Sequence, residues 1–175
     1  MGRDKAFVSF EGTPMVARVA TALRGAGCHP VIAIGGDEDA LGRLGLTVIA
    51  DRWPGEGPLG GVITALDHFS THDLVVPEVV LIAACDLPRL STTTATALIR
   101  ALVDAPAGTD VAMATTDRPQ PLCAAWRPTA AAPLSATFAA GGRRLLDALS
   151  DLRVVDVVVD ADQLTNVNSV ADLPG

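Results

Sequence analysis

The fold of this chain is decided by the stretch Val79-Val80-Leu81-Ile82-Ala83-Ala84-Cys85-Asp86-Leu87-Pro88. A continuous apolar run without polar alternation is typical of a strand covered on both faces, as in a parallel sheet between helical layers. Pro88 stops this strand from continuing. Ligands of such sheets bind outside the carboxyl ends of the strands, so Asp86 is a candidate site residue. The alternative is that Asp86 only caps the following turn.

Similar strand, loop and helix units recur on both sides of this stretch, and such repetition favours a layered α/β domain with a parallel sheet. A helix is predicted to start with Thr13 as its N-cap and Pro14 as its first residue. Ser91 is predicted to cap a helix that runs to about Val103. Further strands are predicted at 30–34, 47–50 and 154–159, a hairpin at 110–126, and helices at 62–69, 129–140 and 143–149.

Length and composition limit the possible classes of protein. The 175 residues suit one domain, and the 49% hydrophobic content with 3% aromatic residues is ordinary for a layered α/β protein. The net charge of −7 disfavours nucleic acid and acidic membrane surfaces as partners, since both require a basic face. No apolar run approaches the roughly 18 residues of a membrane span, and no signal pattern opens the chain. We therefore expect a cytoplasmic protein.

Polar residues at strand ends and in loops are candidates for chemistry. Asp51 follows the strand predicted at 47–50, and together with Asp86 it suits a divalent cation or a ribose. Lys5 is the one lysine among 13 basic residues, which favours a role as a compact positive charge, although chance retention is the alternative. Asn166 and Asn168, two residues apart, would point the same way in an extended segment, or would bond the local backbone.

Other patterns are weaker. The loop at 52–61 is rich in glycine and proline and contains a formal Gly-x-Gly-x-x-Gly, but Pro58 removes an amide that a pyrophosphate would need. His68 and His72 have a spacing that could bind zinc but lack a third ligand nearby. The sequence contains neither a P-loop nor a Gly-x-Ser-x-Gly elbow.

Six short motifs are spread over nearly the whole chain. They are Met1-Gly2-Arg3-Asp4-Lys5-Ala6, Asp51 with Gly57-Pro58-Leu59-Gly60-Gly61, Cys85-Asp86-Leu87-Pro88, Arg118-Pro119-Gln120-Pro121-Leu122, Ala140-Gly141-Gly142-Arg143-Arg144 and Asn166-Val167-Asn168-Ser169. Any one is weak, but the ordered set resembles the bacterial molybdenum cofactor guanylyltransferases of the MobA type.

The resemblance implies a Rossmann-like, three-layer nucleotidyltransferase fold with a mostly parallel sheet. The implied enzyme transfers GMP from GTP to molybdopterin with release of pyrophosphate, requires Mg²⁺ and forms the molybdopterin guanine dinucleotide. Its implied partners are GTP, molybdopterin and molybdoenzyme-maturation proteins.

The resemblance also implies roles for particular residues. Lys5 and Asp86 would be catalytic, Lys5 on the triphosphate and Asp86 on Mg²⁺. The GTP site would contain Lys5, Gly35, Asp51, Gly57, Pro58, Leu59, Gly60 and Asp86, with 57–61 beside the guanine. The molybdopterin half would contain Arg143, Arg144, Asn166 and Asn168.

The chain departs from the family pattern at its start. The family has a strand and a Leu-Ala-Gly-Gly-x-Ser-x-Arg loop immediately before the segment that corresponds to Met1–Ala6, and here the sequence starts at that Met1. We therefore expect a single nucleotidyltransferase domain over 1–175 that is N-terminally incomplete, with a gap in its sheet and half of its phosphate site.

Two other functions remain open from the sequence. A related group transfers CMP to the same cofactor and shares the Lys5 and Asp86 motifs, but it tends to have aspartates where this chain has Asn166-Val167-Asn168. A non-catalytic nucleotide-binding module is the other alternative.

Overall fold

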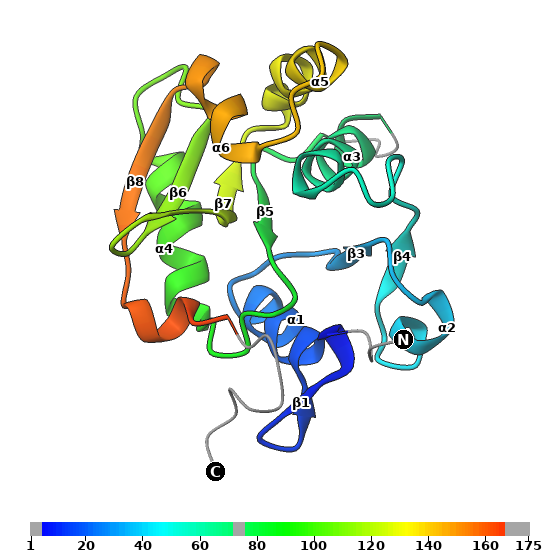
Figure 1. Ribbon diagram of the computed structural model, residues 1–175. Helices are drawn as coiled ribbons and strands as arrows, with labels where there is room; N and C mark the ends of the chain where they lie inside the picture. The colour runs from blue at the N-terminus through cyan, green and yellow to red at the C-terminus, as the bar shows by residue number, and fades with distance from the viewer. Residues whose placement is uncertain (1–4, 72–75, 167–175) are drawn as a thin grey trace.

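The chain folds into three layers, with mixed β-structure between two helical layers (Figure 1). The computed structural model describes residues 5–71 and 76–166. The elements are η1 Lys5–Phe7, β1 Ser9–Phe10, β2 Thr13–Pro14, α1 Met15–Gly25, β3 Ile32–Ile34, α2 Glu38–Gly42, β4 Thr47–Ile49, α3 Pro58–Thr71, β5 Val80–Ala83, α4 Thr92–Val103, β6 Val111–Thr115, β7 Pro119–Trp126, η2 Pro128–Ala130, α5 Ala131–Ala139, α6 Leu145–Ala148, η3 Leu149–Asp151, β8 Val154–Val158 and η4 Ala161–Leu164.

The strands form separate sheets. β3 pairs with β4 in a parallel two-stranded sheet, while β5, β7, β6 and β8 form a four-stranded sheet in that order. The pair β6 and β8 is parallel, but β7 runs antiparallel to both β5 and β6. The hairpin predicted at 110–126 is confirmed, and its second strand is inserted between β5 and β6. In the four-stranded sheet β5, β6 and β8 thus run in one direction and β7 alone in the other, which confirms the mostly parallel sheet expected from the sequence.

Strand alternation divides the core between the two faces of the larger sheet. Val111 and Met113 of β6 pack in one cluster with α3 and α5, whereas Ala112 and Ala114 pack in another with α1 and α4. Successive side chains of a strand point to opposite faces, so one strand serves both clusters. The three-layer fold expected from the sequence is confirmed by this arrangement.

The strand β5 differs from the sequence expectation in its surroundings. It ends before Asp86 as predicted, but among the described strands it pairs with β7 alone, at one edge. Its residues Leu81, Ile82 and Ala83 are only half-buried, whereas Val111–Ala114 of β6 are buried. Both faces of the strand are covered as expected, since Val80 and Ile82 pack in one core cluster and Leu81 and Ala83 in the other, but its second edge borders a cavity.

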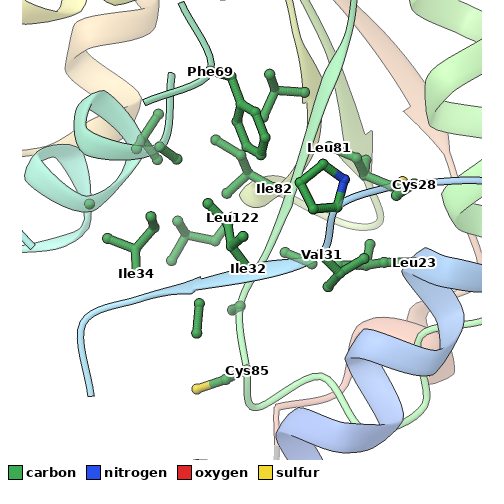
Figure 2. A pocket seen from close by; sticks show the side chains of 18 of the residues that line it. Leu23, Cys28, Val31, Ile32, Ile34, Phe69, Leu81, Ile82, Cys85 and Leu122 are labelled. Carbon is green, nitrogen blue, oxygen red and sulfur yellow. The ribbon is translucent and has the colours of Figure 1, made fainter. Parts of the chain in front are cut away.

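That cavity lies between β5 and β3, and its inner walls are apolar. Figure 2 shows Ile32 and Ile34 of β3, Leu81 and Ile82 of β5, and Phe69 of α3 around the same space. Consecutive residues 30–36 and 79–86 all line it, so both strands present their edges to it. Its volume of about 1340 Å³ exceeds the roughly 300–1,000 Å³ of ordinary ligand pockets.

One of the two helix N-caps predicted from the sequence is confirmed and the other is wrong. Ser91 caps α4, because its hydroxyl accepts a hydrogen bond of 3.1 Å from the Thr94 amide. Thr13 does not cap α1; it pairs with Phe10 in the β1–β2 hairpin, and the helix begins after Pro14. Within the described ranges, no helix is long and apolar enough to cross a membrane.

Candidate active site

One cavity brings together five residues that the sequence assigned to a nucleotide. Its mouth is lined by Gly35, Asp51, Gly57, Pro58 and Asp86, and its interior by the apolar edges of β3 and β5. These residues come from the three loops that follow β3, β4 and β5 and from the first residue of α3. The polar mouth and apolar interior make it a candidate site for a polar ligand that approaches the strand ends.

Asp86 stands at the tip that follows β5, and contacts on either side fix this tip. The Pro88 carbonyl accepts a hydrogen bond of 2.9 Å from Arg18 Nε on α1. Ser91 then starts α4. The Asp86 side chain is half-buried and lines the cavity. The Asp86 carboxylate therefore belongs to the lining of the cavity.

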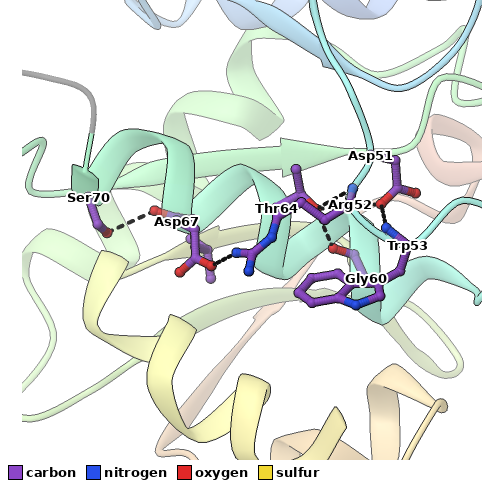
Figure 3. Close-up of polar contacts among 8 residues, drawn as sticks. Asp51, Arg52, Trp53, Gly60, Thr64, Asp67 and Ser70 are labelled. Carbon is purple, nitrogen blue, oxygen red and sulfur yellow. Dashed lines mark hydrogen bonds and ion pairs between the residues drawn. The ribbon is translucent and has the colours of Figure 1, made fainter. Parts of the chain in front are cut away.

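Asp51 is oriented by the chain that follows it (Figure 3). One carboxylate oxygen, Oδ1, accepts a 3.0 Å hydrogen bond from the Trp53 amide, as in an Asx turn. Thr64 of α3 donates its hydroxyl to the Gly60 carbonyl at 2.9 Å and accepts from the Arg52 amide at 3.3 Å. Thr64 therefore ties the 51–53 loop to the first turns of α3, although the sequence analysis did not identify it.

Glycine is favoured at positions 57 and 60 for two different structural reasons. Gly57 has φ +94°, a left-handed conformation that favours glycine. Gly60 is buried inside α3, where an added Cβ would lie 3.2 Å from the Trp53 Cβ. Leu59 is fully buried in the core. The cavity lining thus includes Gly57 and Pro58, while Leu59 and Gly60 support the loop from beneath.

Four side chains stack beside this loop. The Arg52 guanidinium lies 4.5 Å from the Trp53 ring, the Trp53 and Phe138 ring centroids are 4.8 Å apart, and the Arg143 guanidinium lies 3.9 Å from the Phe138 ring. Arg52 also pairs with Asp67 on α3. Arg143 Nε donates a 2.7 Å hydrogen bond to Glu56. The predicted pterin-side Arg143 is therefore in direct contact with the residue that precedes the predicted guanine loop.

The other predicted molybdopterin residues are not gathered at one point. Arg144 is exposed at the N-cap of α6, and one of its guanidinium nitrogens lies 3.7 Å from an oxygen of Asp147 in an ion pair. Asn166 is exposed and follows η4. Because α6 precedes β8 and η4 follows it, these residues lie at opposite ends of that strand (Figure 1). Asn168 lies outside the described residues, as does the side chain of Lys5, whose backbone begins η1.

Among the residues at 5–71 and 76–166, no group of three or more histidine, cysteine, aspartate or glutamate side chains could hold a metal ion. Cys123 is buried, and burial raises the pKa of its thiol to about 12. Cys85, next to Asp86, is exposed. His68 packs edge-on against Phe69, with ring centroids 5.3 Å apart, and His72 lies outside the described residues.

Comparison with known proteins places these observations in a family. A family model described as a MobA-like NTP transferase domain matches residues 1–154. The chain is 34% identical to a protein of Chloroflexus aggregans named "Probable molybdenum cofactor guanylyltransferase", over 98% of this chain and 85% of that protein. A protein of the same name from Mycobacterium marinum is 31% identical over 99% of this chain and 85% of its own length.

Solved structures agree on the fold. The crystal structure of molybdopterin-guanine dinucleotide biosynthesis protein A from Archaeoglobus fulgidus superposes with a TM-score of 0.74 at 24% identity, covering 98% of this chain and 87% of that one. A 4-diphosphocytidyl-2C-methyl-D-erythritol synthase from Anaerococcus prevotii also gives a TM-score of 0.74, at 11% identity, covering 95% and 89%. At these identities the likeness establishes the nucleotidyltransferase fold.

Proposed function

The chain belongs to the family of MobA-like NTP transferase domains, and from this premise we propose that it transfers GMP from GTP to molybdopterin, releasing pyrophosphate. It is a nucleotidyltransferase of molybdenum cofactor biosynthesis. The observation that carries the proposal is the cavity whose mouth joins Gly35, Asp51 and Asp86 to the start of α3. The names of the relatives that match nearly the whole chain favour guanylyl transfer over cytidylyl transfer and over a non-catalytic module.

The proposed chemistry requires little covalent work from the protein. In such transfers, positioning and neutralisation of phosphate charge supply most of the catalysis. The molybdopterin phosphate attacks the α-phosphorus of GTP, the new P–O bond forms, and the bond to pyrophosphate breaks. We assign Asp51 to the nucleoside, Gly35 to a second contact with it, and Lys5 to the charge that develops on pyrophosphate.

The carboxylates at the cavity mouth fit a magnesium ion. Mg²⁺ is usually bound by one or two carboxylates together with substrate phosphates. Asp86 and Asp51 are half-buried on the same cavity, and neither has an ion pair with a described basic residue. Two carboxylates alone would repel a triphosphate, so a cation is required between them and the phosphates. We propose that Asp86 holds Mg²⁺, which when bound neutralises phosphate charge.

The remaining assignments are proposals of the same kind. Gly57 and Pro58 would lie beside guanine, with Leu59 and Gly60 shaping the loop. Arg143 and Arg144 would face the pterin half, with Asn166 and Asn168 approaching from the C-terminal segment. We also propose a cytoplasmic location, where GTP is abundant, and transfer of the product to molybdoenzyme-maturation proteins.

Base choice gives a direct test of this function. We expect that, with Mg²⁺ and molybdopterin present, GTP will be consumed in preference to an equal concentration of CTP. The preference for GTP over CTP should exceed about tenfold. The wrong base cannot make the hydrogen bonds that the loop offers, so buried polar groups of the loop would be left unpaired. Chromatography of the dinucleotide product measures the ratio. A preference for CTP would instead place the chain with the cytidylyl-transferring group.

We further propose that one more extended, apolar segment belongs between β3 and β5, and that it is the first strand of the family, joined to its glycine-rich loop. The apolar walls and large volume of the cavity support this proposal. So does the length of the Chloroflexus relative, of which this chain covers 85%. The resulting sheet would join β3–β4 to the four-stranded sheet.

Amide hydrogen exchange can test this strand residue by residue. The Ala84 amide donates to Leu122 of β7 at 2.8 Å, so by strand alternation the Ile82 amide also faces β7, while those of Leu81 and Ala83 face the cavity. In a chain extended upstream, exchange at Leu81 and Ala83 should slow at least about tenfold. The Ile82 amide serves as the internal control and should change little. Unchanged exchange at Leu81 and Ala83 would show that no strand pairs there.

A further inference from the structure

The guanidinium of Arg143 is held in place by contacts that use only part of its hydrogen-bonding capacity. Its Nη1 donates to the carbonyls of Phe138 and Gly142, at 2.8 and 2.9 Å. Its plane lies over the Phe138 ring, with the central carbon 3.9 Å from the ring centroid. The group is therefore oriented by the end of α5 and would keep this orientation without any other partner.

The remaining edge of the guanidinium is the one that binds oxyanions. Nε and Nη2 of arginine form a fork that matches two oxygens of a carboxylate or phosphate. Here Nε donates to Glu56 Oε2 at 2.7 Å, while Nη2 has no hydrogen-bond partner among the described residues. The Arg143 and Glu56 side chains are 42% and 50% exposed, so an anion can reach the fork from solvent.

Glu56 is supplied by the loop that leads into α3, and this loop is tied to the same aromatic stack. The Glu56 amide donates to the Trp53 carbonyl at 3.1 Å. The Trp53 ring packs on Phe138, the ring over which the Arg143 guanidinium lies. An added Cβ on Gly57 would lie 3.8 Å from the Arg143 carbonyl. A shift of Glu56 therefore involves the loop assigned above to the nucleotide.

We propose that Glu56 is an internal competitor for the anion site of Arg143, closing the Nε/Nη2 fork until a phosphate monoester displaces it. A dianionic phosphate accepts from both nitrogens of the fork, whereas Glu56 engages Nε alone, so the exchange is favourable. The proposal rests on the function proposed above, in which Arg143 faces the phosphorylated substrate. It adds that occupation of this half of the site releases Glu56 and the loop at 53–57.

Inorganic phosphate is the probe for this competition. It is titrated into the 175-residue chain labelled with ¹⁵N-arginine, and the Nε–H resonance of Arg143, assigned by its loss in Arg143→Lys, reports binding at this fork. In Glu56→Gln we expect the apparent Kd at this resonance to fall about two- to fivefold, the range that an exposed ion pair can supply.

Glu78→Gln is the matched control. It neutralises a glutamate in another exposed ion pair, with Arg127, whose N–O distance is 2.6 Å. The Kd at Arg143 should be unchanged in this variant. Unchanged or weaker phosphate binding in Glu56→Gln would overturn the proposal, as would an Arg143 resonance that fails to respond to phosphate in every variant.

The outcome separates this inference from the proposed function. Tighter phosphate binding in Glu56→Gln supports the competition even if GTP turnover is never found. Suppose, conversely, that the chain makes the guanine dinucleotide although its Glu56→Gln variant binds phosphate no more tightly than the parent. In that case the proposed function stands and the competitor role of Glu56 is wrong.

Discussion

Replacing Asp86 with asparagine should abolish guanylyl transfer while leaving the thermal unfolding midpoint nearly unchanged. Asparagine keeps the size of the side chain but removes the charge that we assign to Mg²⁺. A metal ion supplies several kcal/mol of charge stabilisation in a transition state, so the loss should be at least about a thousandfold. The thermal unfolding midpoint should be nearly unchanged because Asp86 makes no ion pair with a described residue and is only half-buried. The measurement is GTP turnover in a chain that carries the family's upstream loop.

Asp104→Asn is the control for this substitution. Asp104 is exposed and follows α4, whereas Asp86 lies before its start, so one helix separates the two carboxylates. Turnover in Asp104→Asn should match that of the parent. If Asp86→Asn retains activity within a few-fold of the parent, the assignment of the metal ligand is wrong. A second readout does not depend on turnover: Mn²⁺ replaces Mg²⁺, and its binding is measured from its paramagnetic effect on water relaxation.

Replacing Lys5 with arginine should reduce turnover about a hundredfold. The substitution keeps the positive charge and changes only its shape and hydration, so it separates geometry from electrostatics. A single well-placed donor to a transition state is worth roughly 3 kcal/mol, which corresponds to that factor. The change belongs in the chain with the upstream loop, since that loop's amides are expected to seat the phosphates.

Arg3→Lys is the reciprocal exchange at a neighbouring position. It should leave turnover within a few-fold of the parent, because no role in the proposed reaction is assigned to Arg3. Near-normal turnover in Lys5→Arg would mean that the lysine is retained by chance and that its charge alone suffices.

The elements that follow from local pattern are the ones that the sequence predicts well. The apolar run before Asp86 forms β5, Ser91 caps α4, and the hairpin at 110–126 is present, because each depends on neighbours along the chain. Asp51 and Asp86 meet at one cavity because the ends of successive strands converge in this fold. The resemblance to the family was confirmed by the comparisons.

Features that depend on distant pairing could not be predicted in the same way. Nothing in the alternation of β7 indicates that it lies between β5 and β6. The cap expected at Thr13 fails because the hairpin with β1 uses that residue. Helix α3 begins at Pro58 rather than Val62, since burial of Leu59 offsets the poor helix propensity of the glycines that follow. Glu56 and Arg143 are 87 residues apart, and charge pattern alone does not pair them.

The two glycines at 57 and 60 should differ in how they vary among relatives. An alanine at 60 would place its Cβ 3.2 Å from the Trp53 Cβ, an atom that every residue except glycine carries, so a smaller side chain at 53 would not relieve the contact. Gly57 is required by its own backbone conformation, which no change in a neighbour relieves. Position 57 should therefore be constrained independently of its surroundings, while position 60 should accept alanine only where the backbone at 53 lies slightly further from α3.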